Sequence, residues 1–156
     1  RPFTSVPFLD NELVPVWRHD HPLAKKLKKS GKSLSAQKFL DLPQLVREQG
    51  SGTRLALEIH CQEHKLNFKP YMELGSSDAL KHAILAGLGV SVVPKLGIQA
   101  ELALGLLEIA PVTGFPLVRS WCLVYPSAKQ PSPVAQAFIN YVRENDKDFG
   151  HHLTCS

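Results

Sequence analysis

Long apolar runs are missing from this 156-residue sequence. No stretch approaches the ~20 consecutive apolar residues that a membrane-spanning helix needs. The first residues also lack the basic start, apolar middle and small-residue cleavage site of a secretory signal peptide. We therefore expect a cytoplasmic protein that has no membrane partner.

Cysteine is also scarce. The sequence holds three cysteines, Cys61, Cys122 and Cys155, and none of them forms a Cys-x-x-Cys pair. An odd number at wide spacing argues against a disulfide framework and against a thiolate metal site. Cys61 and Cys122 lie within apolar patterns, so we expect both to be small side chains of the core.

The charge is basic, with a formal net charge of +4 and a pI near 9.0. Much of the excess lies in one polar segment, residues 19–35, which contains Lys25, Lys26, Lys28, Lys29 and Lys32. This segment breaks at Ser30-Gly31 and has no interleaved aromatic residues. We interpret it as a solvated connector rather than a nucleic-acid-binding surface, because affinity for phosphates needs several charges arranged on one face.

What the sequence does contain is a regular alternation of strands and helices. Apolar periodicity and turn residues predict strands at residues 6–18, 42–48, 68–74, 90–93, 106–110 and 119–126, and helices at 35–40, 53–66, 77–86, 94–104 and 133–145. Residues 90–93 form a continuous run rich in β-branched side chains, which is typical of a strand covered on both faces. The alternation predicts an α/β fold with parallel sheets and helices on their faces.

Helical spacing also predicts which faces of the helices are buried. At about 100° per residue, three apolar stripes emerge. They comprise Leu55, Ile59 and Leu66 in the first long helix, Ala79, Leu80, Ala83 and Ile84 in the second, and Val134, Phe138 and Tyr141 in the last. Gly87 and Gly89 are expected to end the second of these helices.

The first candidate site is the turn Gly50-Ser51-Gly52-Thr53, which lies between a predicted strand and a predicted helix. The start of a helix carries unpaired N–H groups and a partial positive charge, which favour carboxylates and phosphates. Neither the G-x-x-x-x-G-K-[ST] nor the G-x-G-x-x-G spacing of nucleotide-binding loops is present. A plain strand-to-helix turn capped by Thr53 is the alternative.

A second candidate, Gly75-Ser76-Ser77-Asp78, repeats this design. In open α/β sheets, ligands bind beyond the carboxyl ends of the strands, so two such helix starts can face one crevice. We therefore expect a small anionic ligand to be bound by Ser51, Gly52, Thr53, Arg54, Ser76 and Ser77, with Arg54 as the counter-charge. The alternative for the second turn is a serine that only caps its helix.

Other motifs are interpreted structurally. His60 to His64, "HCQEH", fits the H-x-x-E-H pattern of some zinc peptidases, but no downstream motif supplies a third ligand, and we expect an exposed or partly exposed helix face. His19 and His21, on either side of Asp20, are interpreted as exposed histidines of the connector. Ser51 and Ser77 have no evident base nearby in sequence, so we expect no catalytic residue, no metal and no cofactor.

The order of these motifs resembles a known family. "REQGSGTR", followed by "MELGSSDALKHAILAGLGVSVVP" and then "PSPVAQAFINYVRE", is similar to the effector-binding domain of LysR-type transcriptional regulators. The resemblance covers about residues 8–145 and includes "DHPLA" at residues 20–24. The central block most resembles regulators of carbon fixation and inorganic-carbon uptake.

The resemblance implies a periplasmic-binding-protein-like fold of two α/β lobes with mainly parallel sheets. The implied parts are residues 1–20 for a portion of the first lobe and a crossing strand, 21–117 for the second lobe, 118–148 for the return to the first lobe with the last helix, and 149–156 for a tail. The beginning of the first lobe has no counterpart in this sequence, so that lobe is expected to be incomplete. The candidate residues would face a cleft between the lobes.

The resemblance also implies a function. The chain would sense a small anionic metabolite, and the whole regulator would act on DNA as a homodimer or homotetramer through an N-terminal helix-turn-helix that this sequence does not contain. The alternative is a two-lobe solute-binding protein or a small-molecule enzyme of the same fold. Chemical conversion of the ligand would distinguish an enzyme from a sensor.

Overall fold

The structure is a computed structural model that describes residues 3–126, 130 and 132–144, so the expected tail and Cys155 lie outside the described residues. The chain divides into two compact units. One unit comprises Leu13–Leu117, and the other combines Arg1–Glu12 with Val118–Ser156. None of the described helices is long and apolar enough to cross a bilayer.

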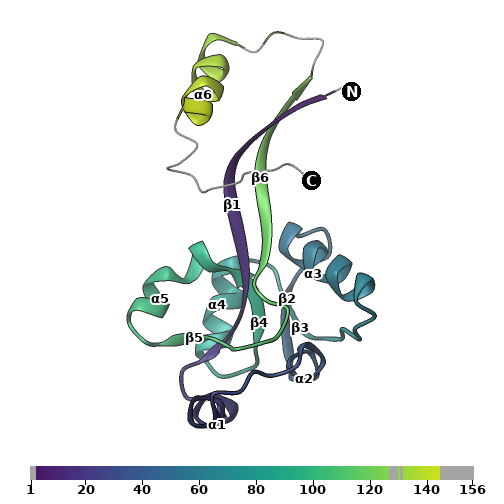
Figure 1. Cartoon of the computed structure of the whole chain (residues 1–156), viewed down its shortest axis with the longest axis vertical. Helices are drawn as coiled ribbons and strands as arrows, with labels where there is room; N and C mark the ends of the chain where they lie inside the picture. The colour runs from purple at the N-terminus through teal and green to yellow at the C-terminus, as the bar shows by residue number, and fades with distance from the viewer. Residues whose placement is uncertain (1–2, 127–129, 131, 145–156) are drawn as a thin grey trace. The chain divides into compact units, whose positions relative to one another are not determined.

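The larger unit is built on two sets of strands (Figure 1). Strand β1 (Phe3–Arg18) runs antiparallel to β4 (Ser91–Pro94) and to β5 (Leu107–Ile109). Strands β2 (Gln44–Arg47) and β3 (Pro70–Leu74) form a parallel pair. A parallel bridge between Gln44 and Val90 connects β2 to the start of the β4 segment.

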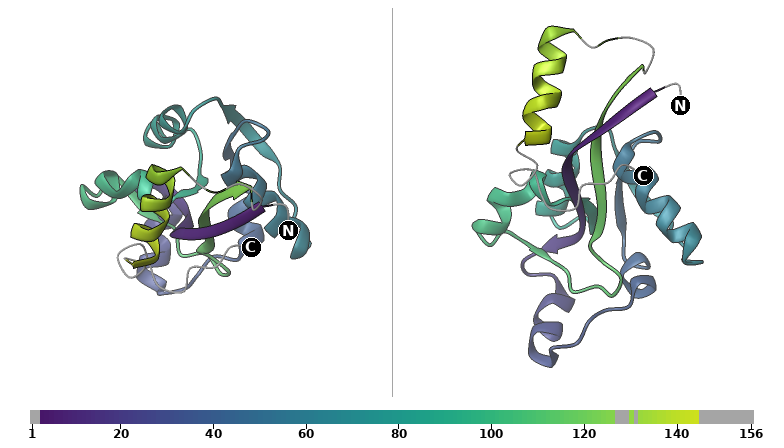
Figure 2. Two further views of the ribbon diagram at one scale, coloured as in Figure 1. Left: turned by 90° about the horizontal axis from the view of Figure 1, so that it is seen from above. Right: turned by 45° about the horizontal axis from the view of Figure 1, so that its top comes forward.

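Helices cover both faces of these strands. Helix α3 lies on one side of β2 and β4, while α4 and α5 lie on the other side (Figure 2). The helical segments of this unit are α1 (Pro22–Ser30), α2 (Ala36–Leu40), α3 (Gly52–Glu63), α4 (Ser77–Leu85), the 3-10 helix η1 (Lys95–Ile98) and α5 (Gln99–Ala103). The strands and helices alternate along the chain, and the predicted α/β class is confirmed.

The core of this unit lies on both sides of β1 and β4. Val92 packs into a cluster built around Trp17 and Phe39, whereas its neighbour Val93 packs into a second cluster around Ile84. Successive residues of a strand point to opposite faces, so this division shows that β4 is covered on both faces, as its β-branched run predicted.

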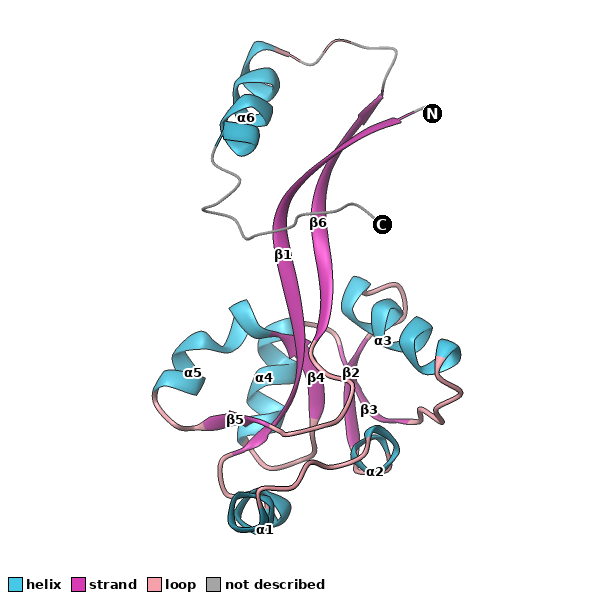
Figure 3. Ribbon diagram, viewed as in Figure 1, coloured by secondary structure: helices cyan, strands magenta, loops and turns pink. Residues whose placement is uncertain are grey.

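The smaller unit contains most of strand β6 (Leu117–Pro126), which enters it at Val118, and helix α6 (Pro133–Glu144). Strand β6 pairs with β1 (Figure 3). The hydroxyl of Ser132 accepts a hydrogen bond from the Ala135 N–H at 3.2 Å, which is the predicted cap. Within α6, Ile139 is fully buried, whereas the three apolar residues of the predicted stripe are exposed, namely Val134, Phe138 and Tyr141.

The connector predicted at residues 19–35 is wrong, because much of it is helix α1. His21 begins this helix by accepting the Leu23 N–H at its Nδ1 atom, 3.2 Å away, and Pro22 occupies the first helical position. Gly31 ends the helix with a left-handed φ of 64°. The interpretation of His21 as an exposed connector residue is wrong too, since its ring stacks on Trp17 with centroids 4.7 Å apart.

The buried face predicted for the first long helix is wrong for Leu55 and Ile59, whereas Leu66, just beyond the helix, is partly buried against the core. Leu55 and Ile59 of α3 are 55% and 39% exposed, and the buried residues of the helix are Arg54, Leu57 and Cys61. A stripe of Leu57 and Cys61 has the same helical spacing as one of Leu55 and Ile59, and the wheel alone did not separate the two. The burial of Cys61 confirms its predicted place in the core, and burial raises the pKa of its thiol.

The helix predicted at residues 94–104 is present in two pieces, η1 and α5. For the second long helix the prediction is confirmed, since Leu80, Ala83 and Ile84 of α4 are buried. Gly87 follows this helix with a left-handed φ of 78°, as expected. Gly89 has a different role, because a Cβ at this position would lie 2.5 Å from the backbone oxygen of Pro43.

Candidate functional site

Helix α3 begins without a side-chain cap. Gly50 turns the chain with a φ of 92°, and Ser51 occupies the N-cap position without accepting a hydrogen bond at its hydroxyl. Thr53 is therefore not the cap that the alternative interpretation assumed. A Cβ on Gly52 would meet no atom within 4 Å, so packing within the chain does not explain this glycine. The first-turn N–H groups of α3 are available to an acceptor from outside the helix.

Helix α4 begins differently. The hydroxyl of Ser76 accepts a hydrogen bond from the Ala79 N–H at 3.0 Å, so this serine caps the helix. The hydroxyl of Ser77 accepts a hydrogen bond from Nη1 of Arg47 at 2.7 Å. The two adjacent serines therefore have separate tasks, and only Ser77 contacts a cation.

Thr53 and Ser77 line the same hollow in the larger unit. It has a volume of about 80 Å³ and lies where β2 and β4 end. Its polar lining consists of Arg47, Thr53, Ser77 and Lys81, and its apolar lining includes Leu80, Ile84, Val93, Pro94 and Ile98. The predicted residues Ser51, Gly52, Arg54 and Ser76 do not line it. A small cavity with cationic and hydroxyl groups at one wall and aliphatic groups at another suits a compact anionic molecule.

Arg47 is held in place by its neighbour. Its Nε and Nη2 atoms donate to the two carboxylate oxygens of Glu48 at 2.9 and 2.8 Å. The hydrogen bonds from Arg47 lower the pKa of the Glu48 carboxyl, and those to Glu48 raise the pKa of the guanidinium. Both groups are therefore charged near neutral pH, and the third nitrogen, Nη1, points to Ser77.

Lys81 forms a second charged contact at this hollow. Its Nζ lies 2.8 Å from Oε1 of Glu101, which joins α4 to α5. The hydrogen bond between them raises the pKa of Lys81 and lowers that of Glu101. Arg47 and Lys81, each paired with one carboxylate, therefore both line this cavity.

Arg54 is buried, and its guanidinium contacts other groups of the protein. Its side chain is 7% exposed, and Nη1 donates to the backbone oxygen of Arg47 at 2.9 Å and to Oε2 of Glu73 at 2.8 Å. Its Nε lies 3.3 Å from the carboxylate of Glu58. The expected counter-charge to a ligand thus joins α3 to β2 and β3 in this structure.

The sequence interpretation missed Arg47 and Lys81. Arg47 directly precedes Glu48, and two adjacent residues of opposite charge in a sequence are usually interpreted as an exposed ion pair. A search for cations at the ends of predicted strands and one turn into the following helices would have found both residues, because those positions face the same sheet edge.

The two histidines of the H-x-x-E-H pattern lie side by side. The rings of His60 and His64 have centroids 4.1 Å apart, and the His60 ring also contacts Phe115 edge-on at 5.4 Å. His64 is exposed and His60 half-buried, as expected. Among the residues that the structure describes, no three His, Cys, Asp or Glu side chains are grouped to hold a metal ion.

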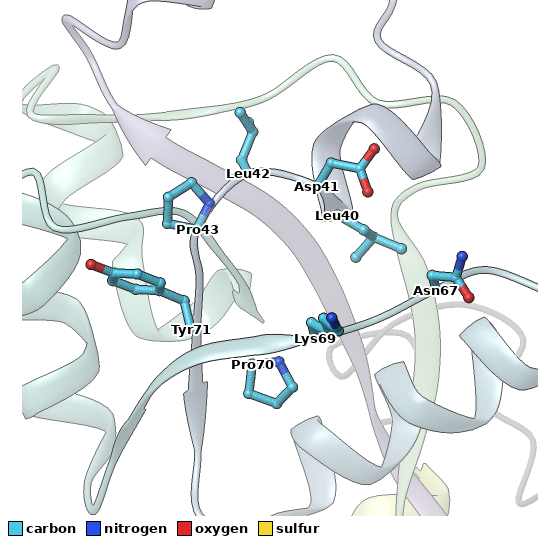
Figure 4. A pocket seen from close by; sticks show the side chains of 8 residues that line it. All are labelled: Leu40, Asp41, Leu42, Pro43, Asn67, Lys69, Pro70 and Tyr71. Atoms are coloured by element: carbon cyan, nitrogen blue, oxygen red, sulfur yellow. The ribbon is translucent and has the colours of Figure 1, made fainter.

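A larger and more open hollow lies at the opposite ends of β2 and β3. It has a volume of about 350 Å³ (Figure 4). Its lining residues are Leu40, Asp41, Leu42, Pro43, Asn67, Lys69, Pro70 and Tyr71. It contains no helix start and only one cation, Lys69, so the features that favour an anion are concentrated in the smaller hollow.

Comparison with known proteins matches this chain to a protein family and to transcriptional regulators. Residues 2–147 match the LysR substrate binding domain family. The chain is 44% identical over 135 residues to a RuBisCO operon transcriptional regulator of Acidithiobacillus ferrooxidans, and the match covers 86% of this chain and 42% of that protein. It is 37% identical over 140 residues to the HTH-type transcriptional activator CmpR of Synechocystis sp., covering 90% of this chain and 44% of the relative.

Solved structures show the same similarity. The CcmR regulatory domain of Synechocystis PCC6803 in complex with 2-PG has a TM-score of 0.81 and 36% identity, covering 94% of this chain and 68% of that one. The effector binding domain of QuiR in complex with shikimate shares the fold, with a TM-score of 0.77 at 23% identity, covering 96% of this chain and 68% of that one. The chain spans less than half the length of the curated relatives it matches.

Proposed function

The chain belongs to the LysR substrate-binding domain family, and from this premise we propose that it senses a small anionic metabolite for a longer DNA-binding regulator of carbon-fixation genes. The observation that carries the proposal is the hollow shared by Thr53 and Ser77, with Arg47 and Lys81 beside them. We take Leu13–Leu117 as the second lobe of the family's fold and the remaining residues as the first.

The proposed ligand carries a carboxylate or a phosphate. It accepts hydrogen bonds from the hydroxyls of Thr53 and Ser77, which line the hollow. Its anionic group extends beyond the lining to the uncapped first turn of α3, where the N–H of Gly52 and the hydroxyl of Ser51 donate to it. Ser76 contributes to ligand binding indirectly, because it caps the start of α4, where Ser77 lies. A phosphorylated or dicarboxylic acid of two or three carbons fits a cavity of about 80 Å³. 2-Phosphoglycolate, which a related regulatory domain binds, is the first compound to test.

Arg47 is the proposed counter-charge in place of Arg54. Arg54 already has Glu73 and the Arg47 carbonyl as partners, whereas Arg47 contacts only the partly exposed Glu48 and Ser77. An incoming anion competes with Glu48 for the same guanidinium. The net binding free energy from Arg47 is therefore the difference between its contact with the ligand and its contact with Glu48. This difference favours ligands with two or three negative charges.

For the whole protein, we propose a cytoplasmic homodimer or homotetramer that binds DNA through a helix-turn-helix segment. The names of relatives, which contain "HTH-type", support the DNA-binding segment. The bound anion shifts the regulator between conformations by its differential affinity for them. We assign no catalytic role to this chain, because its relatives are named as regulators.

Thermal unfolding in the presence of 2-phosphoglycolate tests this proposal. At about 100 times Kd, a ligand stabilises the folded chain by about 2.7 kcal/mol, which corresponds to several degrees in Tm for a domain of this size. Arg47→Gln is expected to remove most of this shift. Arg18→Gln is the matched control, because Arg18 is a partly exposed arginine paired with Asp20 and should leave the shift intact.

A shift that is equal in the wild type and in Arg47→Gln would overturn the assignment of the counter-charge. Analysis of the compound after incubation separates the classes of function. Recovery of unchanged 2-phosphoglycolate supports a sensor, and its conversion would show an enzyme of the same fold.

A further inference from the structure

The lysine-rich segment is ordered in a way that its sequence did not predict. Residues 22–30 form helix α1, so the lysines project from a regular scaffold instead of a loop. At about 100° per residue, Lys25, Lys26, Lys28 and Lys29 fall within an arc of about 160°. Leu23, Ala24 and Leu27 fall on the opposite arc and pack against the core. The condition that a phosphate-binding surface needs, several charges on one face, is therefore met.

The lysines of this face are exposed, and most have no carboxylate partner. Lys28 pairs with Glu108, which fixes α1 to β5. Within the described part of the chain, Lys25, Lys26, Lys29 and Lys32 form no ion pair, and all of them are exposed. The first turn of the helix contains no acidic residue. Helix-dipole compensation accounts for Lys28 and Lys29 in the last turn, but not for Lys25 and Lys26 in the first half.

We propose that this lysine face of α1, formed by Lys25, Lys26, Lys29 and Lys32, is a secondary contact for the sugar-phosphate backbone of duplex DNA. The inference rests on the proposed function, in which the whole regulator is bound to DNA and this face is therefore at high local concentration near phosphates. The face offers no aromatic or amide side chain to read bases, so the contact is independent of sequence. It adds affinity and salt dependence without specificity.

Duplex DNA is favoured over an acidic protein by the chemistry of the face. The face consists of lysines alone, which act as point charges with flexible stems, and it contains neither arginine nor an aromatic anchor. Protein interfaces are depleted in lysine and enriched in aromatic residues and arginine. Apolar residues of α1 face inward, so little apolar surface remains for a protein partner.

The test measures binding of this chain to a fluorescent 30-base-pair duplex of random sequence by anisotropy at several salt concentrations. The wild type is expected to bind at low salt with a log-log salt slope of about −3, as expected for three to four phosphate contacts. The triple variant Lys25→Gln, Lys26→Gln, Lys29→Gln should bind at least ten-fold more weakly and show a slope no steeper than about −1, because only Lys32 of this face remains. Lys28 is kept, so its contact with Glu108 remains.

The matched control is Lys38→Gln, Lys65→Gln, Lys69→Gln, which removes three exposed lysines elsewhere and lowers the net charge of +4 by the same amount. It should retain the affinity and slope of the wild type. Equal weakening of both variants would show that only net charge matters and would overturn the proposal. Tighter binding to polyglutamate than to the duplex at equal charge concentration would overturn it in favour of an acidic protein partner.

These outcomes do not depend on the metabolite. Loss of duplex binding in the α1 variant with an intact thermal response to 2-phosphoglycolate supports the lysine face and leaves the sensor proposal unaffected. If wild-type chain fails to bind the duplex at low salt but responds to the anion, the lysine face is refuted alone. All three substituted side chains are exposed, so the variant is expected to keep the wild-type fold, which circular dichroism checks for the chain as a whole.

Discussion

Arg54 illustrates at the scale of a single residue how burial changes the role of a charge. Its guanidinium contacts the Arg47 carbonyl, Glu73 and Glu58 and is almost inaccessible to water. Arg54→Met keeps the aliphatic stem but leaves these acceptors without a donor. We expect a loss of about 1–3 kcal/mol in the free energy of unfolding, measured by urea denaturation.

Arg18→Met is the comparison for this prediction. Arg18 pairs with Asp20 at 3.0 Å, but both side chains are about half exposed, so the same substitution should cost less than about 1 kcal/mol. If the two variants lose equal stability, the buried contacts of Arg54 are not what holds α3 against β2 and β3.

The turn sequences alone pointed to Thr53 and Ser77, which line the hollow, because hydroxyl side chains at a strand-to-helix turn have local physical reasons to be there. Arg47 and Lys81 could not be found in that way, since their roles depend on the strand order that brings β2, α4 and β4 to one edge. The connector at residues 19–35 failed for the opposite reason. A ring nitrogen of His21 replaces the usual serine or aspartate cap, and the helix signal was hidden.

At the scale of elements, Gly89 determines how closely β2 and β4 approach. The Val90 N–H donates to the Pro43 oxygen at 2.9 Å, and the Leu45 N–H donates to the Val90 oxygen at 2.8 Å. Gly89→Ala places a Cβ 2.5 Å from the Pro43 oxygen, and this backbone atom cannot move without breaking the bridge. We expect a loss of about 1–3 kcal/mol in unfolding free energy.

Gly97→Ala provides the control for Gly89→Ala. A Cβ on Gly97 would meet no atom within 4 Å, so this variant should have wild-type stability in the same denaturation experiment. Wild-type stability of Gly89→Ala would mean that the strands adjust to the added methyl group.

Helix α1 is expected to respond to pH through His21. Burial lowers the pKa of this imidazole below its ordinary value of 6.5, and the charge of Asp20 opposes the shift only in part. The neutral form is needed, because Nδ1 accepts the Leu23 N–H. A lowered folded pKa contributes stability that is present above pH 6.5 and is lost as pH falls through the folded pKa.

Comparison of the wild type with His21→Asn measures this contribution. Asparagine caps a helix without titrating in this range. The stability of the wild type should therefore fall more steeply between about pH 7 and pH 5 than that of the variant. The protection factors of the α1 amides against hydrogen exchange, which correct for the intrinsic effect of pH on the exchange rate, should fall in parallel. Identical pH dependence of the two proteins would rule out the imidazole cap as the cause.

At the scale of the whole molecule, the alternation of strands and helices was sufficient to predict the α/β class, and the motif order was sufficient to identify the family. The pairing of β1 with β4 and β5 joins residues 75 to 93 positions apart in sequence, and such pairing leaves no local signal. The same holds for the cavity, whose polar lining comes from β2, α3 and α4.

The central claim is that the starts of α3 and α4 hold an anion at their shared hollow. A two-dimensional NMR titration of the chain with 2-phosphoglycolate tests it most directly, because each backbone amide reports separately. The account predicts that the largest saturable shifts occur at the amides of Gly52, Thr53 and Ser77. Shifts centred instead on Lys69 and Tyr71, at the larger hollow on the opposite ends of β2 and β3, would contradict it.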